Sequence, residues 1–307
     1  MKRHSLFYLL KPLIPRQLQL HLRRKLIQRK LKRVNHIWPI DFRAAVPPPN
    51  WKGWPGGKDF AFVLTHDVES STGQKNCSKL LEIEESLGFR SSFNFVPERY
   101  PDSPQLRELI ERRGFEVGVH GLNHDGKLFK SYKEFSRRAQ RINRYISSWG
   151  ATGFRAPAMH HHLEWQRDLN IDYDLSTFDT DPFEPQSDGV ETIFPFWING
   201  NGKGNGYVEI PYTLPQDFTL FILMGESNSQ IWQRKLDWIA RNGGMALVNV
   251  HPDYIYFDES ERTPEKFSID IYIEFLNYVK NKYENRFWHV LPKELSIFWK
   301  MNQCGLD

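Results

Sequence analysis

The chain has 307 residues, 40% of them hydrophobic, 25% charged and 14% aromatic, which fits one large α/β domain or two ordinary domains. Its two cysteines, Cys77 and Cys304, exclude a disulfide framework, and free thiols are typical of a reducing compartment. The net charge of +4 is uneven: residues 1–40 hold 11 Lys and Arg and no acidic residue, which leaves 30 of the 41 basic residues against all 37 acidic ones.

The first predicted element is a basic N-terminal arm at residues 1–45. Its longest apolar run, Leu6 to Leu10, is far shorter than a signal-peptide core or a membrane span, so we expect a cytoplasmic protein. Among its arginines and lysines stand Leu18, Leu20, Leu22, Leu26 and Leu31. This pattern allows an amphipathic helix that lies on an anionic membrane. An arm that packs on its own acidic domain is an equal alternative, and nothing beyond charge favours nucleic-acid binding, which we do not expect.

Strand-like and helical stretches alternate after an irregular lead-in at about residues 45–59 that is rich in Pro, Gly and Trp. The predicted strands are 60–67, 91–97, 116–121, 153–157, 173–178, 207–213 and 245–252. The predicted helices are about 75–87, 103–113, 131–148, 228–242 and 266–283. This alternation predicts a parallel α/β domain over residues 46–300, either open or closed into a barrel. The loop-rich region 179–206 predicts an insertion over one face.

Four polar residues fall at the carboxyl ends of predicted strands, namely Asp67, His120, Arg155 and His251. In parallel barrels the loops at that end converge on one mouth, where the chemistry takes place. One charged residue at a strand end is ordinary, but four of them predict a functional site.

The segment THDVE (65–69) offers two carboxylates. Residues two apart in a strand face the same side, so Asp67 and Glu69 could share one site. One carboxylate could then bind a cation while the other takes a proton from water. Acids that only cap a strand end are the alternative.

The segment VGVHGLNHDG (117–126) holds His120 and His124 four residues apart, with Gly121 able to fold the chain back between them. Two imidazoles, a carboxylate and open positions form the ligand set of a catalytic Zn²⁺ or a similar divalent metal. Asn123 and Asp125 could support such ligands through hydrogen bonds.

Two further segments complete the pattern. Arg155 in GFRAP could hold a carboxylate in its ionised form, or form an ordinary structural salt bridge. The adjacent histidines 160–162 point in different directions, so we do not expect them to be ligands. His251 in LVNVHPD is placed to act as a general acid for a leaving amine. Together the four segments predict metal-assisted hydrolysis of an amide.

In this order the segments resemble the motifs of the polysaccharide deacetylase family, the group with chitooligosaccharide-deacetylase homology. The family's first motif is Thr-Phe-Asp-Asp or an Asp-Val-Asp variant, and this chain has THDVE. Its His-x3-His, Arg-x-Pro and final strand-histidine motifs are matched by HGLNH, RAP and VNVHP. Each motif alone is weak, but order and spacing agree over about residues 58–255.

The resemblance implies a distorted (β/α)7-type barrel that removes N-acetyl groups from amino sugars with a bound divalent metal. Carried over to this chain, Asp67 is the general base, Arg155 orients Asp67, and His251 is the general acid. His120 and His124 are metal ligands.

Two departures from the family pattern change the expectations. Val68 occupies the place of the usual metal-binding aspartate, so Glu69 is the expected third ligand, and without it the site would be metal-free. Ala158 stands where the family has an aromatic residue, although its N–H remains available as an oxyanion donor. Asp174 and Asp179, in YDLSTFDTD, are both candidates for the aspartate that tunes His251.

We therefore expect a metal-dependent hydrolase that removes N-acetyl groups from an amino sugar in a polysaccharide, oligosaccharide or lipid-linked glycan. Zn²⁺ is the expected metal, with Co²⁺, Ni²⁺ or Mn²⁺ as alternatives. The rival functions are an amidohydrolase of the same fold acting on a non-carbohydrate C–N bond, and a catalytically inactive glycan-binding module. Contact of residues 1–40 with the inner face of an anionic membrane is one of the two alternatives for the arm.

Overall fold

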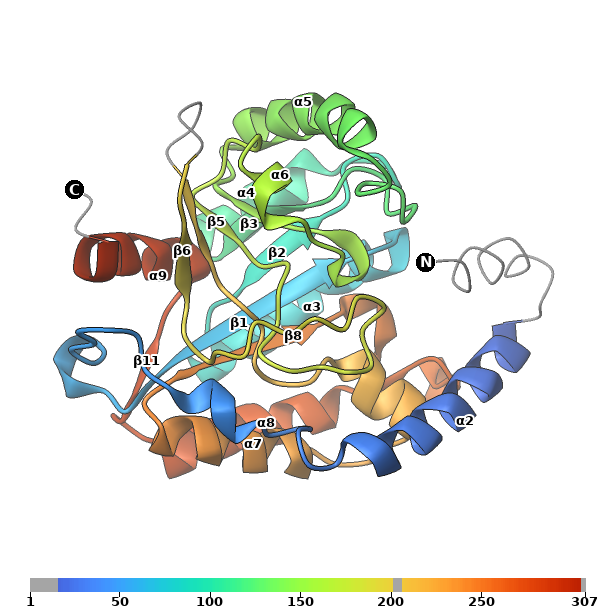
Figure 1. Ribbon diagram of the computed structural model, residues 1–307. Helices are drawn as coiled ribbons and strands as arrows, with labels where there is room; N and C mark the ends of the chain where they lie inside the picture. The colour runs from blue at the N-terminus through green and yellow to red at the C-terminus, as the bar shows by residue number, and fades with distance from the viewer. Residues whose placement is uncertain (1–15, 201–205, 305–307) are drawn as a thin grey trace.

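Strand β1 (Phe60–Val68) is the centre of the sheet in the computed structural model, which describes residues 16–200 and 206–304 (Figure 1). All nine of its residues are buried. It pairs in parallel with β2 (Ser92–Phe95) along its second half, with β11 (Phe287–His289) at its start, and with β8 (Met245–Val250) on the other edge. A strand covered on both faces needs consecutive apolar residues, which the run FAFVL supplies.

The parallel strands continue in one direction from β2 and curl into a barrel. They are β3 (Glu116–His120), β4 (Gly153–Arg155), β5 (Tyr173–Asp174) and β7 (Tyr207–Glu209). Backbone N–H groups of Thr213 and Leu214, just after β7, donate to the carbonyl of Leu247 in β8 over 3.3 and 3.1 Å. The curl thus closes onto β8, and the predicted distorted (β/α)7-type barrel is confirmed.

Helices connect the strands and cover the outside of the barrel, with α5 on one side of the sheet and α7 and α8 on the other (Figure 1). They are α3 (Ser71–Leu87), α4 (Pro104–Arg112), α5 (Tyr132–Trp149), α6 (Leu163–Gln166), α7 (Gln230–Arg241), α8 (Ile269–Lys282) and α9 (Pro292–Trp299). Ser70 caps the start of α3 by accepting hydrogen bonds from two backbone N–H groups, and Gly88 ends it in the left-handed conformation. The five helices expected from the sequence are present, with ends within a few residues of the predicted ones.

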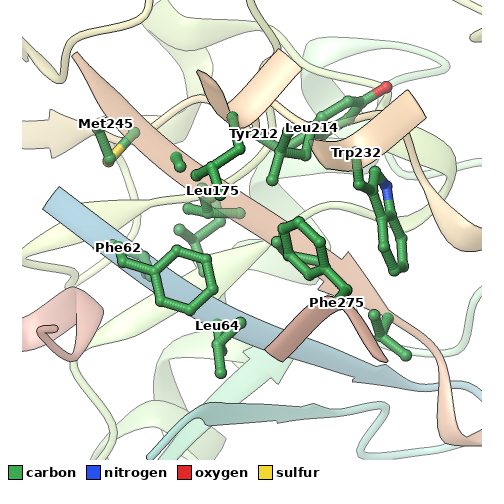
Figure 2. Close-up of a cluster of buried hydrophobic side chains, with 14 of the residues drawn as sticks. Phe62, Leu64, Leu175, Tyr212, Leu214, Trp232, Met245 and Phe275 are labelled. Carbon is green, nitrogen blue, oxygen red and sulfur yellow. The ribbon is translucent and has the colours of Figure 1, made fainter. Parts of the chain in front are cut away.

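The largest buried cluster joins the barrel strands to the helices outside them. Figure 2 shows Phe62 and Leu64 of β1 in this cluster with Trp232 of α7 and Phe275 of α8. The Phe275 ring lies 6.2 Å from that of Phe62 and 5.1 Å from that of Trp232. Much of the aromatic content of the chain therefore serves core packing.

The basic N-terminal arm forms a helix, α2 (Arg16–Val34), from residue 16 onward, whereas residues 1–15 lie outside the described part of the chain. Its Leu20 and Ile27 are buried in the main core, and Arg24 Nε donates to the carbonyl of Ile222 over 2.9 Å. The helix therefore packs on a π-helical turn at Phe218–Met224. None of the described helices is long and apolar enough to cross a membrane.

The predicted insertion at 179–206 is mostly irregular, apart from β6 (Phe196–Ile198), which pairs antiparallel with β7. Its Ile193 bridges two distant segments, since its N–H donates to Ala44 and its carbonyl accepts from Met245. A two-stranded ribbon, β9 (Ile255–Tyr256) and β10 (Phe267–Ser268), follows β8. Residues 201–205 of the insertion lie outside the described ranges.

A buried network on the outer face of β1 generates a stability prediction. Glu84 of α3 lies 2.8 Å from His66 Nε2 and also accepts hydrogen bonds from Ser91 and Tyr272. Glu84→Ala leaves these three buried groups without their acceptor and should lower the free energy of unfolding by about 3–5 kcal/mol, measured by urea denaturation at pH 7. The exposed neighbour Glu82, replaced by Ala, should change it by less than about 0.5 kcal/mol.

The same network has a predicted pH dependence. Burial opposes ionisation of Glu84, but the charge and hydrogen bond of His66 outweigh it and lower the pKa of the carboxyl below its ordinary 4.5. A lowered pKa stabilises the fold above pH 4.5, and this contribution disappears as the pH falls through the folded-state pKa. The difference in free energy of unfolding between wild type and Glu84→Ala should therefore become smaller in acid. A difference that stays constant would contradict the assignment.

Candidate active site

The four predicted strand-end residues meet at one end of the barrel. Asp67 of β1 lies between the others: its Oδ1 is 3.1 Å from Arg155 Nη1 of β4, and its Oδ2 is 4.0 Å from His120 Nε2 of β3. His251, directly after β8, brings Nε2 to 3.9 Å from the same Oδ2. Parallel strands all end at the same edge, so side chains 184 residues apart in the chain can share one site.

Asp67 is a buried, ionised carboxylate. Besides Arg155, the side-chain amides of Asn94 and Asn249 donate to it over 3.1 and 2.9 Å. Burial alone would raise the pKa of Asp67, but the positive charge of Arg155 and the neighbouring histidines outweigh it and hold the pKa well below its ordinary value. The carboxylate is therefore fixed in position and charged at neutral pH.

Arg155 is fully buried and anchors this carboxylate from the far side of the barrel. Its Nη1 also lies 2.9 Å from Thr65 Oγ1 and 2.5 Å from Asn249 Oδ1, and its Nε donates to the carbonyl of Leu175 over 2.9 Å. The contact with Asp67 is thus part of a network across three strands and not an isolated surface salt bridge.

Glu69, His120 and His124 form a cluster in which one potential ligand atom from each lies within 4.8 Å of the others. His120 Nδ1 faces the carbonyl of Arg155 at 3.1 Å, an acceptor that fixes the proton on Nδ1. His120 Nε2 is buried and has no hydrogen-bond partner among the described residues. Burial lowers the pKa of His120 to about 4, so the ring is neutral at pH 7, the form that binds a cation.

The turn after β3 brings His124 back to His120. Gly121 has a φ of 63°, and a Cβ there would lie 2.5 Å from the Pro157 ring, so the turn requires glycine. His124 Nε2 then lies 2.8 Å from Glu69 Oε1, yet it forms no hydrogen bond within the described structure. The unpartnered Nε2 of His120 and the Nε2 of His124, which faces the Glu69 carboxylate, form with that carboxylate a donor set that fits a divalent cation.

Glu69, and not Val68, reaches the histidines. The Val68 side chain is fully buried, whereas Glu69 Oε2 accepts a hydrogen bond of 2.7 Å from Tyr254 and its backbone N–H donates to Asp253 over 2.8 Å. Burial raises the pKa of Glu69, but the adjacent His124 outweighs it and keeps the pKa well below the ordinary value. The group is therefore a charged carboxylate at neutral pH.

Asp217, which the sequence analysis missed, is the partner of His251. Its Oδ1 lies 2.7 Å from His251 Nδ1, and its Oδ2 accepts from the His251 backbone N–H over 2.7 Å. Burial would lower the pKa of His251, but the charge and hydrogen bond of Asp217 raise it to about 10. His251 is therefore protonated at neutral pH, with Nε2 directed at the Asp67 side of the site.

The expectation that Asp174 or Asp179 tunes His251 is wrong. Asp174 accepts hydrogen bonds from Gln166 and Ser176, and Asp179 pairs with Lys235 Nζ at 2.8 Å. Both carboxylates are bound by these buried partners and not by His251. One available signal for Asp217 was its place four residues after the predicted strand 207–213, on the loop side of the barrel.

The structure also shows the surroundings of other residues that the sequence analysis considered. The side chains of Asn123 and Asp125 accept hydrogen bonds from Arg138 of α5 and so hold the loop, and no hydrogen bond from them to His120 or His124 is found among the described residues. His162 stacks on Trp165 with ring centroids 4.0 Å apart, in agreement with a role other than ligation. Ala158 has a φ of 56° in the turn after Arg155, a conformation uncommon for alanine.

The sequence analysis also missed Asn94 and Asn249. Asn249 stands two residues before His251, and Asn94 lies in the predicted strand at 91–97. The period of two in a strand offered a signal for Asn249.

An open cleft of about 630 Å³ adjoins the cluster. Glu69 and Tyr254 lie at its catalytic end, and Arg99, Lys266 and Leu20 of α2 line other parts of its wall. The site is therefore accessible to a ligand larger than water.

The cluster generates a metal-binding prediction. The purified protein should hold about one divalent ion per chain, and His120→Ala or His124→Ala should weaken binding by more than roughly 100-fold, since each removes a ligand. Metal content after dialysis, measured by mass spectrometry, checks this. His162→Ala, outside the cluster, should keep the metal, and full retention in both ligand variants would place the ion elsewhere.

Comparison with known proteins shows a shared fold. No protein-family model and no curated protein sequence matches the chain. A solved structure assigned to the polysaccharide deacetylases, from Mycobacterium smegmatis, matches with a TM-score of 0.61 and 17% identity over 85% of this chain and 96% of its own. One from Pseudomonas aeruginosa PAO1 and the Puue allantoinase each match with a TM-score of 0.63 and 14% identity over 87% of this chain, covering 99% and 98% of their own. The chain therefore has the fold that is found in polysaccharide deacetylases, as its sequence motifs predict.

Proposed function

We propose that the protein is a hydrolase that removes the acetyl group from an N-acetylated amino sugar of a glycan, with a divalent cation held by Glu69, His120 and His124. The observation that carries the proposal is the pairing of this ligand cluster with two proton-transfer groups in opposite states. Asp67 is ionised and His251 is protonated at neutral pH.

The cluster fits a cation through its own chemistry, because His120 Nε2 and His124 Nε2 have no hydrogen-bond partner among the described residues. Two imidazoles and a carboxylate suit Zn²⁺ best, with Co²⁺, Ni²⁺ and Mn²⁺ as alternatives. When bound, such a cation supplies Lewis acidity that polarises an amide carbonyl and lowers the pKa of water.

The chain's own residues divide the proton transfers. Asp67, held by Arg155, Asn94 and Asn249, accepts the proton of the attacking water at its free lone pairs. His251, charged through Asp217, delivers a proton from Nε2 to the departing nitrogen. We infer that the backbone N–H of Ala158, in the turn after Arg155, donates to a developing oxyanion.

An amidohydrolase acting on a small non-carbohydrate C–N bond is the second candidate. It is favoured by the allantoinase that shares this fold with coverage equal to that of a deacetylase. An inactive glycan-binding module is disfavoured, because binding alone requires neither the buried Asp67–Arg155 pair nor a charged His251.

The activity test is release of acetate from a panel of N-acetylhexosamine oligomers and lipid-linked N-acetylated sugars, with allantoin as the small-molecule comparison. Acetate release that is lost when the metal is removed and restored when it is added back supports deacetylation. Turnover of allantoin alone would replace it with the second candidate.

Asp67→Asn and Glu69→Gln should fail in different ways. Asp67→Asn removes the proton acceptor and should keep the metal while kcat falls by roughly 10²–10⁴-fold. Glu69→Gln removes a charged ligand and should weaken metal affinity, with activity partly restored by excess metal. Metal titrations and initial rates on the same preparations check both. If Asp67→Asn loses the metal while Glu69→Gln behaves as wild type, Asp67 is the metal ligand and the proposed roles of the two residues are wrong.

The pH profile tests the role of His251. A general acid must be protonated, so activity should fall on the basic side as His251 loses its proton. Asp217→Asn removes the charge that raises the pKa of His251 and should move the basic limb of kcat/KM to lower pH by about one to two units. Asp174→Asn is the matched control and should leave that limb in place. If the basic limb of the kcat/KM profile does not move in Asp217→Asn, His251 is not the general acid.

A further inference from the structure

Helix α2 has leucines on two faces, and only one face is used by the fold. Leu20 and Ile27 point into the core. On the opposite side Leu18, Leu22 and Leu26 are 48%, 46% and 63% exposed. Residues four apart on a helix lie on one face, so these three leucines form a continuous stripe, called here the outer face of α2.

Positive charges flank this stripe. Lys25, Arg29, Lys32 and Arg33 are exposed, and none of the four forms a salt bridge within the described part of the chain. The helix sequence contains no acidic residue. Other basic residues of α2 are used internally: Arg24 donates to the carbonyls of Ile222 and Pro264, and Lys30 donates to that of Pro182.

We propose that the outer face of α2 docks the protein on an anionic lipid bilayer. A helix that lies in a membrane surface presents apolar side chains to the acyl boundary and cations to the anionic headgroups, and the outer face offers both. Helix packing within the domain does not account for these leucines, because the inner face already supplies Leu20 and Ile27 to the core.

Other occupants fit the outer face less well. A second copy of the chain in a two-fold contact would bring two acid-free helices together, and their charges would repel. A nucleic acid would engage the lysines and arginines but would leave the leucine stripe in water. An anionic bilayer satisfies both kinds of side chain.

Contacts made by other residues of α2, not by its outer face, connect the helix to the candidate active site. The guanidinium of Arg23 lies 5.0 Å from the Phe218 ring centroid, and the Phe218 ring is 4.8 Å from that of Tyr254. Tyr254 donates to Glu69, and Leu20 of α2 lines the same cleft as Glu69. The cleft therefore adjoins α2 on the side opposite its outer face. Access to a membrane-borne substrate rests in addition on the proposed deacetylation, whereas docking does not.

The test is co-sedimentation of the full-length protein with vesicles of phosphatidylcholine containing about one third phosphatidylglycerol. Wild type should bind these vesicles, and binding should weaken with added salt and on pure phosphatidylcholine. Leu18→Gln/Leu22→Gln/Leu26→Gln should lower the partition coefficient at least roughly tenfold, because the apolar contribution is lost while glutamine preserves the helix. Lys25→Gln/Arg29→Gln/Lys32→Gln/Arg33→Gln should lower it at least roughly tenfold and remove the salt dependence.

Matched controls keep the test decisive. Ile297→Gln/Met301→Gln removes side chains that are 49% and 62% exposed elsewhere and should bind vesicles as wild type does. Deletion of α2 is unsuitable, because it would remove Leu20 and Ile27 from the core. Unchanged metal content and thermal unfolding would show that the variants are folded. Wild type that ignores anionic vesicles, or leucine variants that bind normally, would overturn the proposal, as would a dimer that the leucine substitutions dissociate.

Discussion

The buried guanidinium of Arg155 is the constraint on which the site depends. A charge enclosed in a barrel must be compensated, because burying an isolated ion costs far more than a domain's net stability. Asp67 supplies the opposite charge at 3.1 Å, while Thr65, Asn249 and the carbonyl of Leu175 accept other hydrogen bonds from the same group. This pairing fixes β4 against β1 and keeps Asp67 ionised. The ligand cluster and His251 are arranged around that one carboxylate.

Two histidines at nearly equal distances from Asp67 Oδ2 have opposite protonation states because their other ring nitrogens face different groups. His120 Nδ1 faces a neutral carbonyl, and burial lowers the pKa of the ring to about 4. His251 Nδ1 faces the carboxylate of Asp217, which outweighs burial and raises the pKa of the ring to about 10. One group of contacts thus holds one imidazole neutral and the other protonated.

The basic N-terminal segment is integrated with this chemistry through the π-helical turn at Phe218–Met224. Asp217 caps the start of that turn, and α2 covers it. Arg24 and Lys30 donate to backbone carbonyls, so part of the basic charge stabilises the fold, as the alternative of an arm packed on its own domain predicts. The exposed cations and leucines of the same helix remain available for a partner. The packing alternative therefore applies to the inner face of α2, and membrane contact by its outer face stays a proposal.

The sequence alone determined the alternation of strands and helices, because apolar periodicity and caps such as Ser70 and Gly88 act locally. It also placed Asp67, His120, Arg155 and His251 at strand ends, and parallel topology then required them to meet. Only the tertiary structure decided that Asp217, and not Asp174 or Asp179, holds His251, and that Glu69 reaches the histidines past the buried Val68. The tertiary structure also decided which face of α2 packs on the domain. These features depend on how the loops fold back beyond the strand ends. There, side chains that are distant in sequence compete for the same partners, and the local sequence pattern does not predict which pair forms.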